Sequence, residues 1–405
     1  MVVAAVVLGP GSILTSSKVG AGFGGIGVPV VIAAAVMMIG MVALAARIGV
    51  SYQHSTCDEI SERLGRPVAV VVGLILFLVV ALFQSSNNLA MVAGLAPLVE
   101  MANGGKPVGT TAQILLLLAF NGVLIAVLYL MRELYQSVEK LMKFLIGVMV
   151  VAFLVNFLFA YLTPRTFEFV APIVHLDKGD LFALLGMIGT TFSVGGAFYQ
   201  SYLVKEKGWG ISDAKRGLLD TVVSISVLGG VTVMILLTSM RVFFGNPNQP
   251  ELLSVDQVAR QLEPLFGSWA SVIFSLGILA AAFSSFLVNA MIGGTVMSDA
   301  IRKGSRLSDG WPIHLTGVAL LTGMGVAMLS LTQSGSHVTL ITIAQALTVV
   351  GNPALAAALI YLGTRPEMTG SRRIPRWILT LAWIGFFVSC FVAVRTGMAV
   401  WAKIG

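Results

Sequence analysis

Two short stretches rich in glycine and hydroxyl side chains interrupt long apolar segments, and their residue types are suited to binding a ligand. The first reads Gly9-Pro10-Gly11-Ser12, and the second runs from Gly189 to Gly196 as Gly-Thr-Thr-Phe-Ser-Val-Gly-Gly. Gly and Pro inside an apolar helix free backbone N–H and C=O groups, which then need neighbours, water or a ligand. Close helix packing through small residues is the alternative explanation. Pro10 and the flanking hydroxyls favour a binding site.

The candidate ligands are neutral oxygen donors at these two breaks. The residues expected here to bind a substrate, and a metal ion if the substrate is one, are Gly9, Ser12, Thr190 and Ser193. Further polar residues are expected to line a path to the site: Thr15, Lys18, Gln84, Asn87, Asn88, Ser284, Ser285 and Asn289. Hydrogen bonding between helices is the alternative role for the Gln, Asn and Ser residues of this set. For Lys18 the alternative is an ammonium group that reaches toward the membrane interface.

Ionisable side chains are missing from the middle of the apolar segments. All 18 Asp and Glu residues, and all four His residues, fall in expected loops or at segment ends. A dehydrated transition-metal ion usually needs carboxylate, imidazole or thiolate ligands, and proton transfer through a membrane also relies on titratable groups. A cation at this site would therefore keep its water, as Mg²⁺ does. With no nucleophile–base pair and no metal cluster in these segments, we expect neither an enzyme nor a cofactor.

The elements that must position these residues are membrane helices. The chain has 405 residues, of which 57% are hydrophobic and 11% are charged, whereas soluble proteins carry about 25% charged residues. Apolar runs of about 20 residues recur from end to end, which is the length of a membrane-crossing helix, and they lack the alternation of a membrane β-barrel. The sequence predicts an all-α integral membrane protein whose main partner is the lipid bilayer. A soluble enzyme and a nucleic-acid-binding protein are excluded.

Eleven membrane spans are predicted. They cover residues 1–24, 28–47, 67–100, 111–131, 141–163, 181–204, 217–240, 269–297, 312–331, 338–362 and 377–400. Most of the 25 Lys and Arg residues fall in loops on one side of this arrangement. The loops of the other side hold only Lys106, Arg165, Lys178, Arg241 and Arg260. The positive-inside rule then places the N-terminus in the cytoplasm and the C-terminus outside a cell membrane.

A weak internal repeat relates the third and eighth spans. Residues 81–94 and 281–294 share Ala, Phe, Ser, Ala, Met and Gly in register. These spans are equivalent in a five-plus-five inverted repeat, and so are the broken first and sixth spans. Transporters are often built in this way, with the solute bound at paired helix breaks. We expect a first repeat over residues 1–163, a second over residues 181–362, and one additional span at 377–400.

Several motifs in order along the chain resemble the NRAMP (natural resistance-associated macrophage protein) family of divalent-metal transporters. They are the loop from Thr56 to Pro67, the eighth span with Ser284, Ser285, Gly294 and Met297, and Gln345 followed eight residues later by Pro353. The resemblance covers nearly the whole chain. It implies a LeuT-type fold with eleven transmembrane helices and broken first and sixth helices. It also implies that Gln345 joins Gly9, Ser12, Thr190 and Ser193 in binding the substrate or metal ion.

The chain departs from this family at its metal-binding motifs. Gly9 stands where the family has Asp, and Ser12 stands where it has Asn. The family's Met and His of the sixth span are replaced by Ser193 and Gly195. In the third span, the family's Asp and Glu align with Gln84 and Asn87. The scaffold is kept while the ligands are changed.

Three functions follow from these observations. The first is an NRAMP-like secondary transporter that moves a divalent metal cation, such as hydrated Mg²⁺ or Mn²⁺, by alternating access and without the usual proton-coupling residues. The alternative is the same fold carrying a neutral or anionic small solute (an organic acid, an amino acid or an inorganic anion), favoured by half-helix N-termini and by Lys18. The third is a membrane sensor or degenerate paralogue that transports nothing. The sequence predicts no particular oligomeric state.

Overall fold

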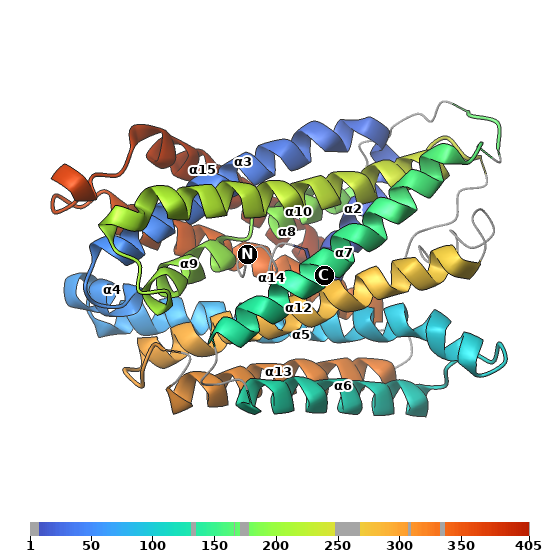
Figure 1. Ribbon diagram of the computed structural model, residues 1–405, viewed down its shortest axis with the longest axis horizontal. Helices are drawn as coiled ribbons and strands as arrows, with labels where there is room; N and C mark the ends of the chain where they lie inside the picture. The colour runs from blue at the N-terminus through green and yellow to red at the C-terminus, as the bar shows by residue number, and fades with distance from the viewer. Residues whose placement is uncertain are drawn as a thin grey trace.

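The protein is a bundle of long, roughly parallel and antiparallel helices (Figure 1). A computed structural model describes residues 8–130, 135–165, 167–170, 178–247, 268–306, 309–332 and 337–404. In these ranges every regular element is a helix, as predicted. The α-helices are α2 (Pro10–Phe23), α3 (Gly27–Ser51), α4 (Thr56–Leu64), α5 (Arg66–Ala102), α6 (Thr110–Leu130), α7 (Tyr135–Leu162), α8 (Lys178–Thr191), α9 (Val194–Glu206), α10 (Ala214–Phe243), α12 (Ser268–Ala300), α13 (Gly310–Thr332), α14 (His337–Gly363) and α15 (Arg376–Ile404). The 3₁₀ helices are η1 (Gly24–Ile26), η2 (Ile211–Asp213) and η3 (Gly370–Arg372).

The helices have the length and surface of membrane spans. Among the described residues, eight stretches are long and apolar enough to cross a bilayer, with Pro10–Ser51 taken as one stretch. Large apolar side chains such as Leu130, Phe144 and Phe387 are exposed on the outside of the bundle. The prediction of a multi-pass membrane protein is confirmed. Each predicted span coincides with a helix, or with the α8–α9 pair, in the described part of the chain.

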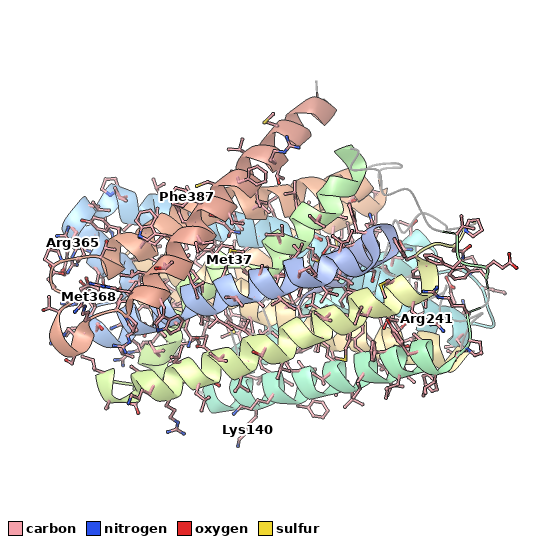
Figure 2. The ribbon with its side chains drawn as sticks, turned by 90° about the horizontal axis from the view of Figure 1, so that it is seen from above. Met37, Lys140, Arg241, Arg365, Met368 and Phe387 are labelled. Carbon is pink, nitrogen blue, oxygen red and sulfur yellow. The ribbon has the colours of Figure 1, made fainter. Side chains whose placement is uncertain are left out.

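The predicted loops fall at opposite ends of the bundle. Figure 2 shows Arg365 and Met368, which lie between the tenth and eleventh predicted spans, at one end of the helices. Arg241, which lies at the end of the seventh predicted span, is at the other end. The separation is the one that the predicted topology requires.

The predicted break in the sixth span is present. Helix α8 ends at Thr191 and helix α9 begins at Val194, so only Phe192 and Ser193 separate them. In the first span, α2 begins at Pro10 directly after Gly9. Proline is well suited to the first turn of a helix, where its missing N–H has no intrahelical partner to lose. Residues 1–7 lie outside the described part of the chain, so only the second half of this span is seen.

Helices α5 and α12, which carry the repeated motif, pack side by side in antiparallel orientation (Figure 1). A Cβ atom built on Gly94 would lie 2.6 Å from Ile278 Cγ2, and one built on Gly293 would lie 3.1 Å from Val80 Cβ. The small residues therefore let the two backbones approach closely, as is common between membrane helices. An inverted repeat requires this antiparallel pairing. The repeat boundaries at 1–163, 181–362 and 377–400 stay a prediction.

Candidate functional site

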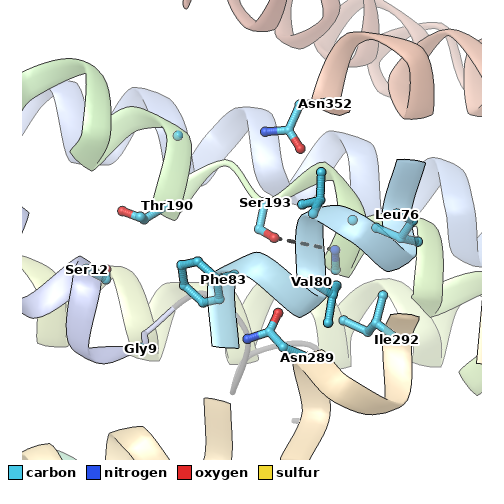
Figure 3. A pocket seen from close by; sticks show the side chains of 14 residues that line it. Gly9, Ser12, Leu76, Val80, Phe83, Thr190, Ser193, Asn289, Ile292 and Asn352 are labelled. Atoms are coloured by element: carbon cyan, nitrogen blue, oxygen red, sulfur yellow. Dashed lines mark hydrogen bonds between the residues drawn. The ribbon is translucent and has the colours of Figure 1, made fainter. Parts of the chain in front are cut away.

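A cavity of about 50 Å³ lies at the break between α8 and α9 (Figure 3). Helices α2, α5, α8, α9, α12 and α14 all contribute to its wall. The polar side chains and backbone in that wall belong to Gly9, Ser12, Gly189, Thr190, Ser193, Gly195, Gly196, Asn289 and Asn352. The apolar side chains are those of Leu76, Val79, Val80, Phe83 and Ile292. The cavity therefore has one polar side, formed around the two helix breaks, and one apolar side from α5.

Four of the five predicted ligands meet in this cavity. Gly9 and Ser12 reach it from α2, whereas Thr190 and Ser193 reach it from the α8–α9 break. The fifth, Gln345, lies in α14, but its side chain falls outside the described residues. The two pairs lie about 180 residues apart in the sequence, and the fold brings them to one cavity. Their role as ligands stays a proposal.

The hydroxyl groups of Ser12 and Thr190 can still bind a ligand in the cavity. Ser12 Oγ is buried and has no hydrogen-bond partner among the described residues. Thr190 Oγ1 donates to the carbonyl oxygen of Gly186 at 3.0 Å, which leaves its lone pairs available to a cation or a water molecule. Burying a hydroxyl without a partner is costly. A substrate or its water would remove that cost.

The break itself exposes backbone groups of both signs. Ser193 caps α9, because its Oγ accepts a hydrogen bond from the N–H of Gly196 at 3.4 Å. At the other side of the break, the N–H of Phe192 donates to Ile188 O at 2.8 Å. By contrast, no backbone N–H of a described residue donates to the carbonyl oxygen of Gly189 or to that of Thr190. The end of α8 therefore offers carbonyl oxygens with partial negative charge, which favour a cation.

Gly9 leaves no room for a side chain. A Cβ atom built on Gly9 would lie 2.7 Å from Ser285 Oγ and 3.6 Å from Asn87 Oδ1. Its carbonyl oxygen accepts the N–H of Ser12 at 3.0 Å and that of Ile13 at 3.2 Å, so it is largely engaged in starting α2. The space that a carboxylate at this position would need is thus occupied by polar groups of α12 and α5.

Asn289, predicted to lie on the path, lines the cavity itself. Its Nδ2 donates to both the carbonyl oxygen and the Oγ of Ser285, each at 2.9 Å. These two bonds fix the orientation of the amide, and no described residue donates to Asn289 Oδ1. The oxygen is therefore the atom that Asn289 offers to the cavity. Because Ser285 Oγ packs against Gly9, the missing side chain at position 9 helps to hold Asn289 in place.

The other predicted path residues mostly join helices. Gln84 Nε2 donates to Phe286 O on α12 at 2.6 Å, and Asn121 Nδ2 on α6 donates to Asn88 Oδ1 at 2.6 Å. Asn87 Nδ2 donates to Gln84 Oε1 at 3.0 Å, while Asn87 Oδ1 is buried without a partner in the described residues. Hydrogen bonding between helices, the alternative role, therefore describes Gln84 and Asn88. These residues lie behind the cavity wall and do not line it.

The remaining three path residues also lie off the cavity. Thr15 Oγ1 donates to Gly11 O at 2.9 Å, and Ser284 Oγ donates to Ala281 O at 3.1 Å. Lys18 is half-buried on α2 and is not among the described residues that line the cavity. The structure thus gathers Gly9, Ser12 and Asn289 into one site and leaves these three to the surrounding helices.

Asn352 is the lining residue that the sequence reasoning missed. It lies in α14, directly before Pro353. The signal was present, because a single amide next to a proline in an apolar helix is unusual. The spacing of Gln345 and Pro353 instead indicated Gln345 as the ligand of this helix.

A second polar cluster fastens the far end of α9. Asp299, near the end of α12, accepts hydrogen bonds from Tyr202 Oη at 2.7 Å, from Ser55 Oγ at 2.7 Å and from the N–H of Cys57 at 3.3 Å. We call these four residues the Asp299 cluster. They join α9 to α12 and to the start of α4, and Cys57 is fully buried there. Within the described residues there is no group of three or more His, Cys, Asp or Glu side chains suited to a metal ion.

The comparisons with known proteins agree with this architecture. The chain is 24% identical over 401 residues to the divalent metal cation transporter MntH of Klebsiella pneumoniae (strain 342), covering 98% of this chain and 90% of that protein. The MntH of Mesorhizobium japonicum is 24% identical over 386 residues, covering 93% and 82%. A manganese transporter of Eremococcus coleocola matches with a TM-score of 0.75 at 18% identity, covering 100% and 85%. MhsT, solved with L-phenylalanine, matches with a TM-score of 0.66 at 17% identity, covering 98% and 97%.

The fold is therefore of the LeuT type, as the resemblance implied. The sequence profile of one family, natural resistance-associated macrophage protein-like (Nramp), matches residues 1–399. That match spans almost the whole chain and includes both helix breaks. The protein belongs to the Nramp family.

Proposed function

We propose that this protein is a secondary transporter that carries a divalent metal cation, Mg²⁺ or Mn²⁺, together with part of its water shell. The ion would bind between the start of α2 and the α8–α9 break and would reach each side of the membrane by alternating access. The MntH relatives and the manganese transporter named above support a divalent cation as cargo. The protein is a membrane transporter and not an enzyme.

The size of the cavity is the observation that carries this proposal. A buried water needs ~10–15 Å³ of such space, so about 50 Å³ holds one small ion with a few water molecules. Lys18, which favoured an anion, does not line this cavity. The alternative of a neutral or anionic solute is therefore not favoured.

The chemistry of the lining selects a hard ion that keeps water. The donors are hydroxyls of Ser12, Thr190 and Ser193 and the amides of Asn289 and Asn352, all uncharged. Removing all water from a divalent ion without anionic ligands would cost far more than such donors return. Mg²⁺ binds oxygen ligands and loses its water reluctantly, whereas softer ions gain from thiolate or thioether sulfur, which this lining lacks.

Proton coupling through the third span is not part of the proposed mechanism. Gln84 and Asn87 cannot titrate, and their amides are tied to each other at 3.0 Å. Transport of the ion is then driven by its own electrochemical gradient. Flux that stays the same when a pH gradient is imposed would support this, and an ion flux that depends on the pH gradient would contradict it.

We further propose that the Asp299 cluster lies at the cytoplasmic end of the bundle. That end carries Arg63 and Arg66 on α4 and α5, Lys205 on α9, and Arg365 after α14. Excess Lys and Arg mark cytoplasmic loops. The N-terminus would then be cytoplasmic and the C-terminus outside. Labelling of single cysteines placed in the loops, from each side of the membrane, tests the assignment.

The direct test is isothermal titration of the purified protein with Mg²⁺ and Mn²⁺, together with ion flux into liposomes. Ser12→Ala is expected to weaken binding, because Ser12 lines the cavity and its buried Oγ has no hydrogen-bond partner among the described residues. Ser389→Ala on α15 is the matched control, since this buried hydroxyl donates to Phe386 O at 2.7 Å and Ser389 does not line the cavity. Saturable binding that only Ser12→Ala weakens supports the site. Absence of binding and of flux with both ions would refute the function.

A further inference from the structure

We propose that Asn352 is a specificity-determining residue of this transporter, whose side-chain oxygen holds a water molecule of the hydrated cation. The inference rests on the proposed function and adds to it a residue and a mode of recognition. It concerns the ion's water shell, not direct contact between the protein and a dehydrated metal.

The first observation is that the Asn352 amide has no protein partner. The residue is 7% exposed and lines the cavity. No described residue donates a hydrogen bond to its amide or accepts one from it. An amide that lacks a protein partner and opens on a cavity is available to whatever fills that cavity.

The second observation is that the packing of α14 fixes the direction of Asn352. A Cβ atom built on Gly351 would lie 3.0 Å from the Cγ2 atoms of both Ile75 and Val79 on α5. On the other side, Val349 Cγ2 would lie 2.7 Å from a Cβ atom built on Gly189 of α8. These close contacts on either side leave α14 no freedom to rotate about its axis. The amide is therefore held in the wall of the cavity.

The third observation is that a second amide is placed across the break. Figure 3 shows Asn352 and Asn289 on opposite sides of Ser193, on α14 and α12. Asn289 directs its oxygen to the cavity, because both hydrogens of its Nδ2 are used by Ser285. Two amide oxygens from unbroken helices thus face the hydroxyls and carbonyls of the broken ones.

The chemistry of a hydrated cation matches this arrangement. Water bound to a cation turns its oxygen toward the ion and its hydrogens outward, so the surrounding protein must supply acceptors. Amide oxygens do so, and such water-mediated contacts are nearly as favourable as direct hydrogen bonds. Mg²⁺ usually keeps several waters when it binds to a protein. An ion that must shed its water gains nothing from these acceptors, so they favour the more strongly hydrated ion.

The test replaces Asn352 in two ways. Asn352→Leu keeps the approximate size of the side chain and removes the acceptor, so Mg²⁺ affinity measured by titration should fall about three- to tenfold, the size of one hydrogen bond. Mn²⁺, which gives up water more readily, should lose less, so the Mg²⁺/Mn²⁺ affinity ratio should decrease. Asn352→Asp places a carboxylate in the cavity and should raise the affinity for Mn²⁺ and create binding of Cd²⁺, since anionic ligands stabilise a less hydrated ion.

The matched control is Asn156→Leu. Asn156 is a buried amide on α7 whose Nδ2 donates to Ala152 O at 3.0 Å, and it does not line the cavity. Its replacement should leave both affinities unchanged, and size-exclusion profiles confirm that each variant is folded. If the unmodified protein binds Mg²⁺ but Asn352→Leu and Asn352→Asp leave affinity and ion preference unchanged, the role of Asn352 is refuted while the proposed function stands. If the unmodified protein binds neither ion, the proposed function fails, and this inference fails with it.

Discussion

Adding a single methyl group at Gly9 should disturb the ion site through α12. In Gly9→Ala, the new Cβ would lie 2.7 Å from Ser285 Oγ and 3.3 Å from Ser285 Cβ. Forcing an extra carbon into a packed interior costs ~1–3 kcal/mol. Ser285 would have to move, and one of the two hydrogen bonds that orient Asn289 would be lost. That bond adds about 1 kcal/mol to the effect, so we expect a loss of stability of ~2–4 kcal/mol and an affinity for Mg²⁺ that is about fivefold lower.

The assay is unfolding of the detergent-solubilised protein, followed by tryptophan fluorescence, together with Mg²⁺ titration. Gly22→Ala is the matched control on the same helix, because a Cβ atom built on Gly22 meets nothing within 4 Å. Ser285→Ala removes the 2.7 Å contact, so Gly9→Ala and Ser285→Ala together should cost less than the sum of the two single changes. The reasoning is refuted if Gly9→Ala is as harmless as Gly22→Ala, or if the double variant is strictly additive.

Three other results follow from contacts elsewhere in the bundle. Tyr202→Phe removes a hydrogen-bond donor to Asp299 and should loosen the Asp299 cluster around the Cys57 thiol, whose pKa is raised by burial. In a protein whose other cysteine is replaced by serine, maleimide should then alkylate Cys57 several-fold faster at neutral pH. An unchanged rate would mean that Tyr202 does not hold the cluster closed. A hydrogen bond from Arg63 lowers the pKa of Glu367. The ionised Glu367 therefore stabilises the protein fully above the usual Glu pKa of about 4.3, and this stabilisation is lost as the pH falls through the lowered pKa. Glu367→Gln should be less stable than the unmodified protein at pH 7, and the difference should shrink as the pH is lowered below about 4.3; a difference that does not change with pH would contradict this. Gly20→Ala would press a methyl group against a backbone carbonyl of α10, so the protein should lose ~1–3 kcal/mol of stability in the same fluorescence assay, and a neutral result would mean that α2 and α10 can separate freely.

The residues of the two breaks were predictable because their signal is local. Gly9 and Ser12 follow one another within four residues, and so do Thr190 and Ser193, and the chemistry of a broken membrane helix can be read from such a stretch alone. The long apolar helices were predictable for the same reason, because length and hydropathy suffice to identify them.

Other features depend on contacts between distant parts of the chain. Ser285 is close to Gly9 only because α12 packs beside the start of α2. Asn352 faces the cavity because α5 and α8 fix the rotation of α14, and the sequence of α14 alone does not say which of its faces is turned inward. Gln84 was expected on the path, yet its amide reaches Phe286 O on α12. In each case the role is set by the partner helix and not by neighbouring residues.

Helix α9 links the cavity to the Asp299 cluster, so a movement at one end of the helix displaces the other end. It holds 13 residues, which makes it a rod about 20 Å long at 1.5 Å per residue. Ser193 caps one end beside the cavity, and Tyr202 lies toward the other end. Tyr202 lies nine residues from Ser193, about 14 Å along the helix axis, so a pivot of about 10° at Ser193 would move it by ~2 Å. That travel exceeds the stretch that a 2.7 Å bond to Asp299 can tolerate. Filling or emptying a cavity the size of a few water molecules can thus be amplified, by leverage alone, into unlocking a contact at the membrane surface.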